Sequence, residues 1–288
     1  MKFVLFILLF IPLSRASIKH FPLDDYDYRP GQDVGIGAYQ AFSLHGTKKI
    51  VLTFDDGPHL IQTPKILDLL KSYNVKATFF INTAHLNQKK LLLAHRILKE
   101  GHILASHDYN HRDNNKEDED LFKKELLQSL KDIKSIEKEA GVHQKGIYFR
   151  FPFGYYGKNP HYHHLNVIKD LSHEIYGENC INVAFWDIDT KDWGPTMSSE
   201  EIAQNVKAHM EGGWAPTVIS ENNKWKKIRI KIKNPPKGGV ILLHDTKKET
   251  FHGTKLILEM AKEKNWEVVP INGVKEFSYE NKNCEESF

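Results

Sequence analysis

Short apolar runs alternate with longer segments of helical periodicity along the chain from Lys49 onward. The runs are β-branched, aromatic or aliphatic and lack a clean polar alternation, which is typical of strands buried on both faces of a sheet. We predict strands at 49–54, 77–81, 102–105, 147–150, 181–186, 239–243 and 266–270. Seven β–α alternations predict a parallel α/β barrel or a doubly wound sheet.

Residues that commonly begin and end helices flank several of the intervening segments. Thr63 followed by Pro64 predicts an N-cap and a first helical residue. Ser198 with Glu201 predicts a capping box. Gly141 ends a long amphipathic segment, as C-terminal glycines do.

Two segments do not follow the alternation. Residues 17–47 form an N-terminal extension, and residues 214–237 are expected to form an inserted hairpin or excursion before the sixth strand. We therefore expect one α/β domain over residues 48–275 and a C-terminal tail at 276–288. The length of 288 residues and the 40% hydrophobic content suit one large domain with a real core.

The N-terminus has the layout of a secretory signal peptide. Lys2 precedes an apolar stretch at 3–13, and small residues follow up to Ala16, which predicts a signal peptide at 1–16. The stretch is shorter than the roughly 20 residues needed to cross a bilayer. We expect a secreted protein (extracellular, periplasmic or associated with the cell wall) with no stable membrane anchor; an uncleaved anchor is the alternative.

Composition narrows the function only slightly. The net charge is +3, with Lys and Arg scattered along the chain, so nothing argues for nucleic-acid binding and acidic polymers are mildly favoured. Export would permit a disulfide between Cys180 and Cys284. The sequence leaves that pairing open, because it does not give the distance between them.

Polar clusters follow five of the predicted strands. They read TFDDG, SHDYNH, RFPFG, WDIDTKDW and LLHD in chain order. The C-terminal ends of parallel strands form one face of an α/β barrel, so these side chains are expected to converge there. Packing alone does not account for five such clusters, and the pattern predicts an active site.

Two of these clusters contain candidate metal ligands. Asp55 and Asp56 are adjacent carboxylates that repel each other unless a cation or a shared proton compensates, although an Asx-type turn is an alternative reading. His107 and His111 are four residues apart, close enough on a helical turn to share a metal, although two surface histidines would also explain them. Together with Asp56 they form a His/His/Asp set that suits zinc or a similar divalent ion.

TFDDG, the HxxxH segment, RFPFG, DxxDW and LLHD, in this order and spacing, resemble the five motifs of the polysaccharide deacetylase family. These are the NodB-homology enzymes of carbohydrate esterase family 4. The resemblance covers roughly residues 48–270 and implies a distorted (β/α)7 barrel that hydrolyses acetyl groups from a polysaccharide. It also implies a divalent metal, most simply Zn²⁺, with Co²⁺ or another divalent ion as alternatives.

The family pattern assigns roles to individual positions. Asp56, His107 and His111 would hold the metal. Asp55 would be the general base that activates the attacking water, and Arg150 would pair with Asp55 and keep it ionised. Direct attack by a water that Asp55 activates needs no covalent intermediate, and the sequence contains no nucleophile elbow that would suggest one.

The same pattern assigns the remaining steps. The backbone N–H of Phe153 would stabilise the oxyanion on the attacked acetamide. His244 would protonate the departing amine, and Asp192 would orient and charge that histidine. Trp193 and Leu242 would wall the acetyl pocket. Apart from the family pattern, Tyr155 is an aromatic residue near the site that is expected to stack on a sugar ring, with core packing as the alternative.

One position departs from the family. Asp108 stands where Ser or Thr usually follows the first histidine, and we expect it to cap the loop amides as a hydroxyl would. Its charge could instead raise metal affinity or shift the pKa of the bound water.

The complete motif set predicts N-deacetylation of N-acetylglucosamine in a cell-wall polysaccharide by a monomer. Peptidoglycan is favoured by the bacterial-looking signal peptide and the lack of an accessory chitin-binding domain. Chitin or chitooligosaccharides, acetylated exopolysaccharides and xylan O-acetyl groups are alternative substrates. A non-catalytic carbohydrate-binding protein and an unrelated barrel amidohydrolase are the competing classes.

Overall fold

The computed structural model describes residues 20–24, 28, 40–157, 164–222 and 224–284. The predicted signal peptide at 1–16 and most of the predicted N-terminal extension lie outside these residues. In the part of the chain that is described, no helix has the length and apolar character needed to cross a membrane.

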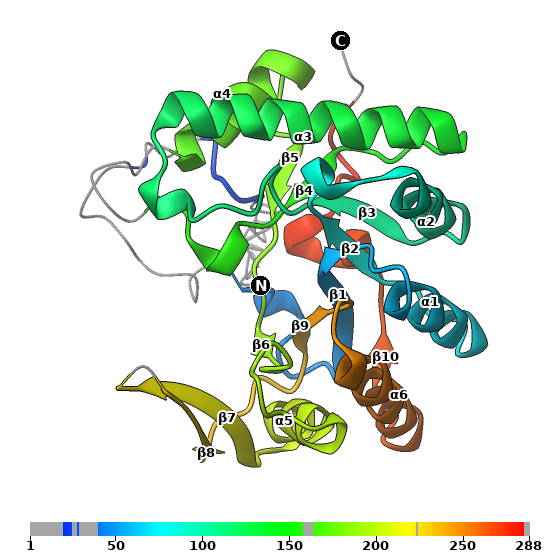
Figure 1. The fold of residues 1–288 in the computed structure, drawn as a ribbon, viewed down its shortest axis with the longest axis vertical. Coiled ribbons are helices and arrows are strands. Elements are labelled where there is room, and N and C mark those ends of the chain that lie inside the picture. The colour runs from blue at the N-terminus through cyan, green and yellow to red at the C-terminus, as the bar shows by residue number, and fades with distance from the viewer. Residues whose placement is uncertain (1–19, 25–27, 29–39, 158–163, 223, 285–288) are drawn as a thin grey trace, which may run out of the picture.

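A curled sheet of eight strands forms the centre of the molecule, with the order β5-β4-β3-β2-β1-β9-β6 and with β10 beside β1 (Figure 1). Every pairing in it is parallel. The strands are β1 (Lys49–Gly57), β2 (Thr78–Ile81), β3 (Ile103–Ser106), β4 (Ile147–Phe149), β5 (Ile181–Val183), β6 (Ile188–Asp189), β9 (Gly239–His244) and β10 (Glu267–Val268).

Strand order decides between the two predicted architectures. From β1 to β5 each new strand is added beside the previous one, so crossovers of one hand place their helices on the same outer side. The barrel prediction is confirmed and the doubly wound alternative is wrong. Each of the seven predicted runs contains an observed strand, whereas the sequence missed the two-residue β6.

Six α-helices of the described residues surround the sheet: α1 (Gln62–Ser72), α2 (Gln88–Lys99), α3 (Glu119–Ala140), α4 (His164–Tyr176), α5 (Ser199–Glu211) and α6 (Lys248–Glu263). The capping box of Ser198 and Glu201 is present at the start of α5, which confirms that prediction. Gly141 closes α3 in the left-handed region at φ +69°, where glycine carries no steric penalty.

The predicted start of α1 is wrong. The helix begins at Gln62, so Pro64 lies inside its first turn and Thr63 is not the N-cap. The Nδ1 atom of His59 instead accepts the N–H groups of Ile61 and Gln62 at 3.2 and 3.1 Å. The hydroxyl of Thr63 is turned inward and donates to the carboxylate of Asp245.

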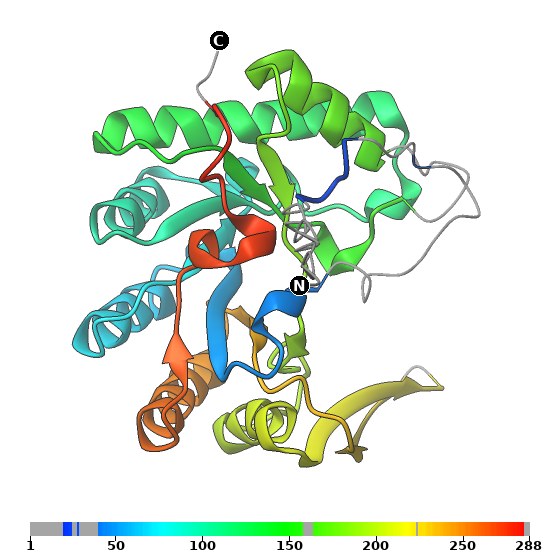
Figure 2. The same ribbon diagram turned by 180° about the vertical axis from the view of Figure 1, so that it is seen from behind.

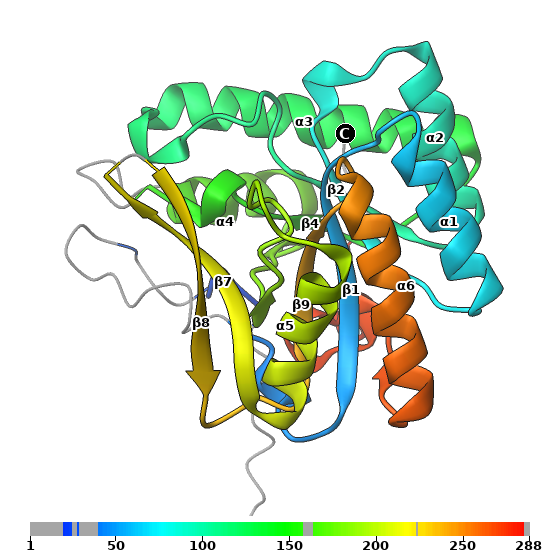
Figure 3. The same cartoon turned by 60° about the horizontal axis from the view of Figure 1, so that its bottom comes forward.

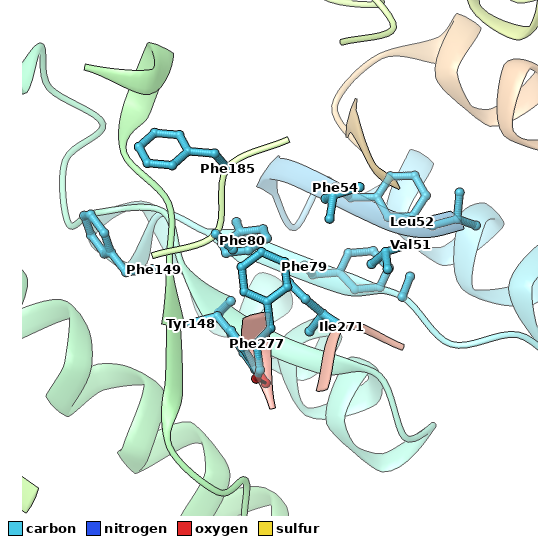
Figure 4. Close-up of a cluster of buried hydrophobic side chains, with 14 of the residues drawn as sticks. Val51, Leu52, Phe54, Phe79, Phe80, Tyr148, Phe149, Phe185, Ile271 and Phe277 are labelled. Atoms are coloured by element: carbon cyan, nitrogen blue, oxygen red, sulfur yellow. Dashed lines mark hydrogen bonds between the residues drawn. The ribbon is translucent and has the colours of Figure 1, made fainter. Parts of the chain in front are cut away.

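Buried apolar side chains of the strands pack against one another and against those of the C-terminal segment (Figure 4). Phe54 of β1 and Phe79 of β2 stack with ring centroids 5.1 Å apart, and both are fully or almost fully buried. Burying an aromatic side chain of this size contributes about 1.5–3 kcal/mol. The continuous apolar runs of the sequence are explained by this burial on both faces of each strand.

The C-terminal segment closes the end of the barrel opposite the motif clusters (Figure 2). Tyr148 donates its hydroxyl proton to the carbonyl of Phe277 at 2.7 Å, and the amide of Asn182 donates to the carbonyl of Glu276 at 3.0 Å. A disulfide joins Cys180 to Cys284, with the two Cα atoms 5.5 Å apart. The pairing that the sequence left open is therefore made.

The segment predicted as a hairpin or excursion forms an antiparallel ribbon of its own. It consists of β7 (Gly213–Glu221) and β8 (Lys224–Ile232), which pair with each other in a separate sheet. Figure 3 shows the ribbon running along one flank of the molecule beside α5. The amide of Asn205 in α5 donates to the carbonyl of Pro216, which anchors β7 to that helix.

Candidate active site

The end of β1 brings two adjacent carboxylates to the same imidazole. Asp55 is buried and lies opposite His244 in the β1–β9 register. The register with β2 shifts between Asp55 and Gly57, and Asp56 has a φ of +73°. Bulges at strand ends commonly re-aim a side chain, and here Oδ2 of Asp55 and Oδ1 of Asp56 lie 3.7 and 3.5 Å from Nε2 of His107.

Asp56, His107 and His111 converge on one point. The Oδ1 atom of Asp56 lies 3.1 Å from Nε2 of His111 and 3.5 Å from Nε2 of His107. One ligand atom from each of the three residues lies within 4.8 Å of the other two. Asp56 Oδ1 is buried and has no hydrogen-bond partner, despite the proximity of the two imidazoles. Such an orphaned oxygen beside two nitrogens fits a cation held by all three residues.

The protonation of His107 is consistent with that fit. Burial lowers the pKa of His107, whose Nδ1 lies 2.9 Å from the carbonyl of Arg150. A proton on Nδ1 donated to that carbonyl leaves the lone pair of Nε2 for a cation shared with Asp56. Against the effect of burial, the hydrogen bond and charge of Asp56 raise the pKa of His111, so a cation would have to displace a proton there. Burial raises the pKa of Asp56, but the nearby imidazoles outweigh burial and hold it well below its usual range.

Arg150 is buried completely and orients Asp55. Its Nη1 donates at 2.8 Å both to Oδ1 of Asp55 and to the hydroxyl of Thr53, and its Nε donates to the carbonyl of Ala184 at 2.7 Å. The guanidinium carbon lies 4.1 Å from the centroid of the Phe80 ring. A buried arginine with this many partners holds one geometry, so the side chain of Asp55 is held in one orientation beside the cluster.

Asp192 and His244 form the second ion pair of the site. Oδ1 of Asp192 lies 2.7 Å from Nδ1 of His244, while Oδ2 accepts the backbone N–H of His244 at 2.7 Å and the hydroxyl of Thr250 at 2.6 Å. Burial by itself lowers the pKa of His244, but the charge and hydrogen bond of Asp192 outweigh burial and raise the pKa to about 10. His244 is therefore an imidazolium at neutral pH.

The remaining predicted residues lie around these two groups. Phe153 has a φ of +58°, and its ring meets that of His111 edge-on with centroids 4.7 Å apart. The Tyr155 ring lies 5.5 Å from the Phe153 ring and is partly exposed. Trp193 donates its indole N–H to Asp189 at 3.2 Å. Leu242 is buried in β9, opposite Thr53 of β1.

The geometry has counterparts among known proteins. The family model described as polysaccharide deacetylase matches residues 44–174. Over these residues the chain is similar to the polysaccharide deacetylase family. The matched range contains Asp55, Asp56, His107, His111 and Arg150, whereas Asp192 and His244 follow it in the chain.

Two similar curated proteins come from Bacillus species. A peptidoglycan-N-acetylglucosamine deacetylase of Bacillus cereus is 33% identical over 169 residues, which is 59% of this chain and 54% of that protein. The peptidoglycan-N-acetylmuramic acid deacetylase PdaA of Bacillus subtilis is 31% identical over 183 residues, covering 62% of this chain and 61% of PdaA. The chain thus spans between half and two thirds of these relatives.

A solved structure of a peptidoglycan N-acetylglucosamine deacetylase superposes with a TM-score of 0.58 at 26% identity, over 80% of this chain and 89% of that one. The distorted (β/α)7 barrel implied by the motifs is confirmed by this similarity together with the strand order.

Asp245 of the LLHD motif is a site residue that the sequence reading passed over. It is completely buried, accepts the hydroxyl proton of Thr63, and burial raises its pKa to about 7. A Cβ atom at Gly57 would lie 2.3 Å from both Asp245 carboxylate oxygens, so only glycine fits there. Both residues stand in motifs that the sequence analysis identified: Gly57 ends TFDDG and Asp245 ends LLHD.

Asp108, which departs from the family pattern, contacts the backbone of its own loop. It is fully buried at φ +68°, and its Oδ2 lies 3.5 Å from the backbone N of Arg112. Burial, with the charges of Glu117 and Glu125 adding to it, raises the pKa of Asp108 to about 6. This contact is the loop-capping arrangement expected of a side chain here.

Proposed function

We propose that this protein is a metal-dependent N-deacetylase that removes acetyl groups from N-acetylglucosamine units of peptidoglycan outside the cytoplasm. The observation that carries the proposal is the convergence of Asp56, His107 and His111 beside an arginine-paired carboxylate and a carboxylate-paired histidine. The names of the curated relatives support peptidoglycan as the polymer.

The donor set supports a divalent cation with open coordination positions. Two imidazole nitrogens and one carboxylate oxygen suit Zn²⁺, and they also accept Co²⁺. A divalent ion held there supplies Lewis acidity, which polarises an acetyl carbonyl and makes water a better nucleophile. We therefore assign Asp56, His107 and His111 as ligands and Zn²⁺ as the ion.

Asp55 is placed to take the proton from the attacking water. Its Oδ1 is occupied by Arg150, whereas Oδ2 lies 3.7 Å from Nε2 of His107 and so faces the ligand cluster. The hydrogen bond from the buried arginine holds Asp55 in place for the role of general base. Charge that develops on the acetyl oxygen would be stabilised by the backbone N–H of Phe153, next to His111.

His244 is placed to protonate the departing nitrogen. It is already an imidazolium because Asp192 raises its pKa, and Asp55 lies opposite it across the β1–β9 pairing. Amide hydrolysis needs a proton on nitrogen before the C–N bond breaks. A base and an acid on neighbouring strands can take the proton from water and deliver one to the nitrogen. Trp193 and Leu242 are assigned to the acetyl pocket, and Tyr155 to contact with the sugar.

The test is acetate release by the purified protein from peptidoglycan sacculi and from chitooligosaccharides, with and without a chelator and added Zn²⁺. We expect chelator-sensitive release from sacculi. Asp55→Asn is expected to abolish turnover and keep the metal, whereas His107→Ala is expected to lose the metal. Near-normal turnover by Asp55→Asn would overturn the base assignment, and release from chitooligosaccharides alone would overturn the choice of polymer.

A further inference from the structure

Positive charge is concentrated on the ribbon of β7 and β8, which the proposed chemistry does not use. Residues 213–233 contain one acid, Glu221, and six cations: Lys224, Lys226, Lys227, Arg229, Lys231 and Lys233. The whole chain has a net charge of only +3. The excess positive charge of the protein therefore resides on this ribbon, and the rest of the chain is close to neutral.

Alternate residues of β8 share one face of the ribbon. Residues directly opposite each other on paired strands project to the same side, so Trp225 shares a face with Ser220, and Lys231 with Trp214. We call this surface the Trp225 face; in β8 it consists of Trp225, Lys227, Arg229 and Lys231. At about 3.4 Å per residue, the row extends roughly 20 Å.

Two of the three cations of the Trp225 face have no ion pair in the described part of the chain. Lys227 pairs with Glu201 of α5 at 2.7 Å, which fixes the ribbon to the body of the protein. Arg229 and Lys231 are exposed and form no ion pair within the described residues, although the charge of Arg229 helps to lower the pKa of Glu201. Trp225 and Trp214 are 51% and 55% exposed, so both rings present apolar surface to solvent.

The Trp225 face begins at the proposed active site. The ring of Trp225 meets that of Trp193 edge-on, with centroids 5.4 Å apart. Trp193 directly follows Asp192, which holds His244, and the ammonium of Lys191 lies 5.3 Å from the Trp193 ring centroid. Figure 3 shows the ribbon rising along the flank of the barrel toward the end at which β1 finishes. A polymer extending from the catalytic residues past Trp193 would therefore reach the ribbon.

We propose that the Trp225 face binds the part of a carboxylate-bearing glycan strand that lies beyond the sugar being deacetylated. Aromatic rings stack on the apolar faces of sugars, and an arginine or lysine every second residue pairs with carboxylates along the strand. This inference rests on the proposed function and extends it, because it makes the enzyme selective for a long anionic polymer over a short neutral oligosaccharide. Charge complementarity and continuity with the catalytic residues favour a glycan over a lipid surface.

The test compares Arg229→Gln/Lys231→Gln with the remote pair Lys99→Gln/Lys131→Gln, which removes equal charge from exposed positions on α2 and α3. We expect the ribbon variant to bind sacculi roughly fivefold more weakly by co-sedimentation at low salt, with a shallower salt dependence. Its kcat/KM on short neutral chitooligosaccharides is expected to stay within about twofold of wild type. The remote variant is expected to match wild type in both assays.

Trp225→Ala provides a second arm that does not depend on charge. It is expected to weaken sacculus binding without changing the salt dependence. Unaltered binding by both ribbon variants, equal losses in the remote variant, or binding of the wild type to anionic phospholipid vesicles in preference to sacculi would each overturn the proposal. Because co-sedimentation needs no turnover, it tests the ribbon even if acetate release fails and the proposed chemistry is wrong.

Discussion

Replacing Asp192 by Asn removes the charge that keeps His244 protonated while changing the side-chain volume very little. Three donors now converge on the carboxylate: Nδ1–H and the backbone N–H of His244, and the hydroxyl of Thr250. An Asn amide offers one acceptor oxygen, so its NH₂ group must meet one of these donors. If the NH₂ faces Nδ1, the neutral ring carries its proton on Nε2 and becomes a far weaker acid.

The magnitude follows from the influences on the pKa of His244. The pKa is about 10, so the ring is almost fully protonated at pH 7.5. Burial lowers this pKa, Asp192 raises it by its charge and hydrogen bond, and the charges of Asp56 and Asp55 raise it further. A cation held by Asp56 would offset those last charges, so without the Asp192 carboxylate we expect a pKa at or below the ordinary value of about 6.5. The protonated fraction at pH 7.5 then falls below about one tenth, and turnover is expected to fall at least tenfold.

The assay is the pH dependence of kcat for acetate release between pH 5 and 9, with the metal content of each sample measured alongside. Wild type is expected to stay active toward alkaline pH, whereas Asp192→Asn is expected to recover activity only as the pH falls below about 6. Asp170→Asn, an exposed change of the same kind in α4, is the control. If Asp192→Asn has the kcat of wild type and the same pH dependence of kcat, His244 is not the general acid.

Three further predictions concern stability, measured by urea unfolding. Replacing Cys180 and Cys284 together by Ser should lower the free energy of unfolding by about 2–4 kcal/mol and spare turnover, because the bridge closes a loop of sequence separation 104 remote from the site; loss of turnover in folded protein would contradict this. Buried His102 has a pKa lowered to about 4, so its neutral form stabilises the fold fully above pH 6.5 and that contribution is lost as the pH falls toward 4. His102→Asn should therefore reduce the loss of unfolding free energy between pH 7 and 5 by about 2 kcal/mol, and an unchanged pH dependence would refute the assignment. Gly57→Ala should cost about 1–3 kcal/mol, because the new Cβ would overlap the Asp245 carboxylate; an unaltered midpoint would show that the carboxylate moves aside freely.

Local signals in the sequence determined a large part of the fold. Continuous apolar runs predict strands buried on both faces, and burial of Phe54 and Phe79 from β1 and β2 agrees with that reading. The capping box at Ser198 is a contact between residues three apart, so it forms wherever the helix forms. The N-cap predicted at Thr63 was wrong because the hydroxyl of Thr63 donates to a carboxylate that is distant in sequence, that of Asp245.

The candidate site could be anticipated from the sequence because parallel strands deliver their C-terminal residues to one face. That rule predicts that Asp55, His107 and His244 approach one another, although 137 residues separate the last two in the chain. It does not predict which oxygen of a carboxylate faces which partner. The bulge at Asp56, the complete burial of Arg150 and the inward turn of Asp245 depend on packing between strands far apart in sequence.

The sequence by itself determined the strands, several helix ends and the set of chemically active residues, because each depends on local pattern or on one general property of parallel sheets. Only the tertiary structure decided between barrel and doubly wound sheet, paired Cys180 with Cys284, and brought Trp225 against Trp193. These are contacts across long stretches of chain, whose formation depends on the position of every element between them. Residue type and spacing do not determine which residues that are distant in sequence come into contact, so only the structure shows these contacts.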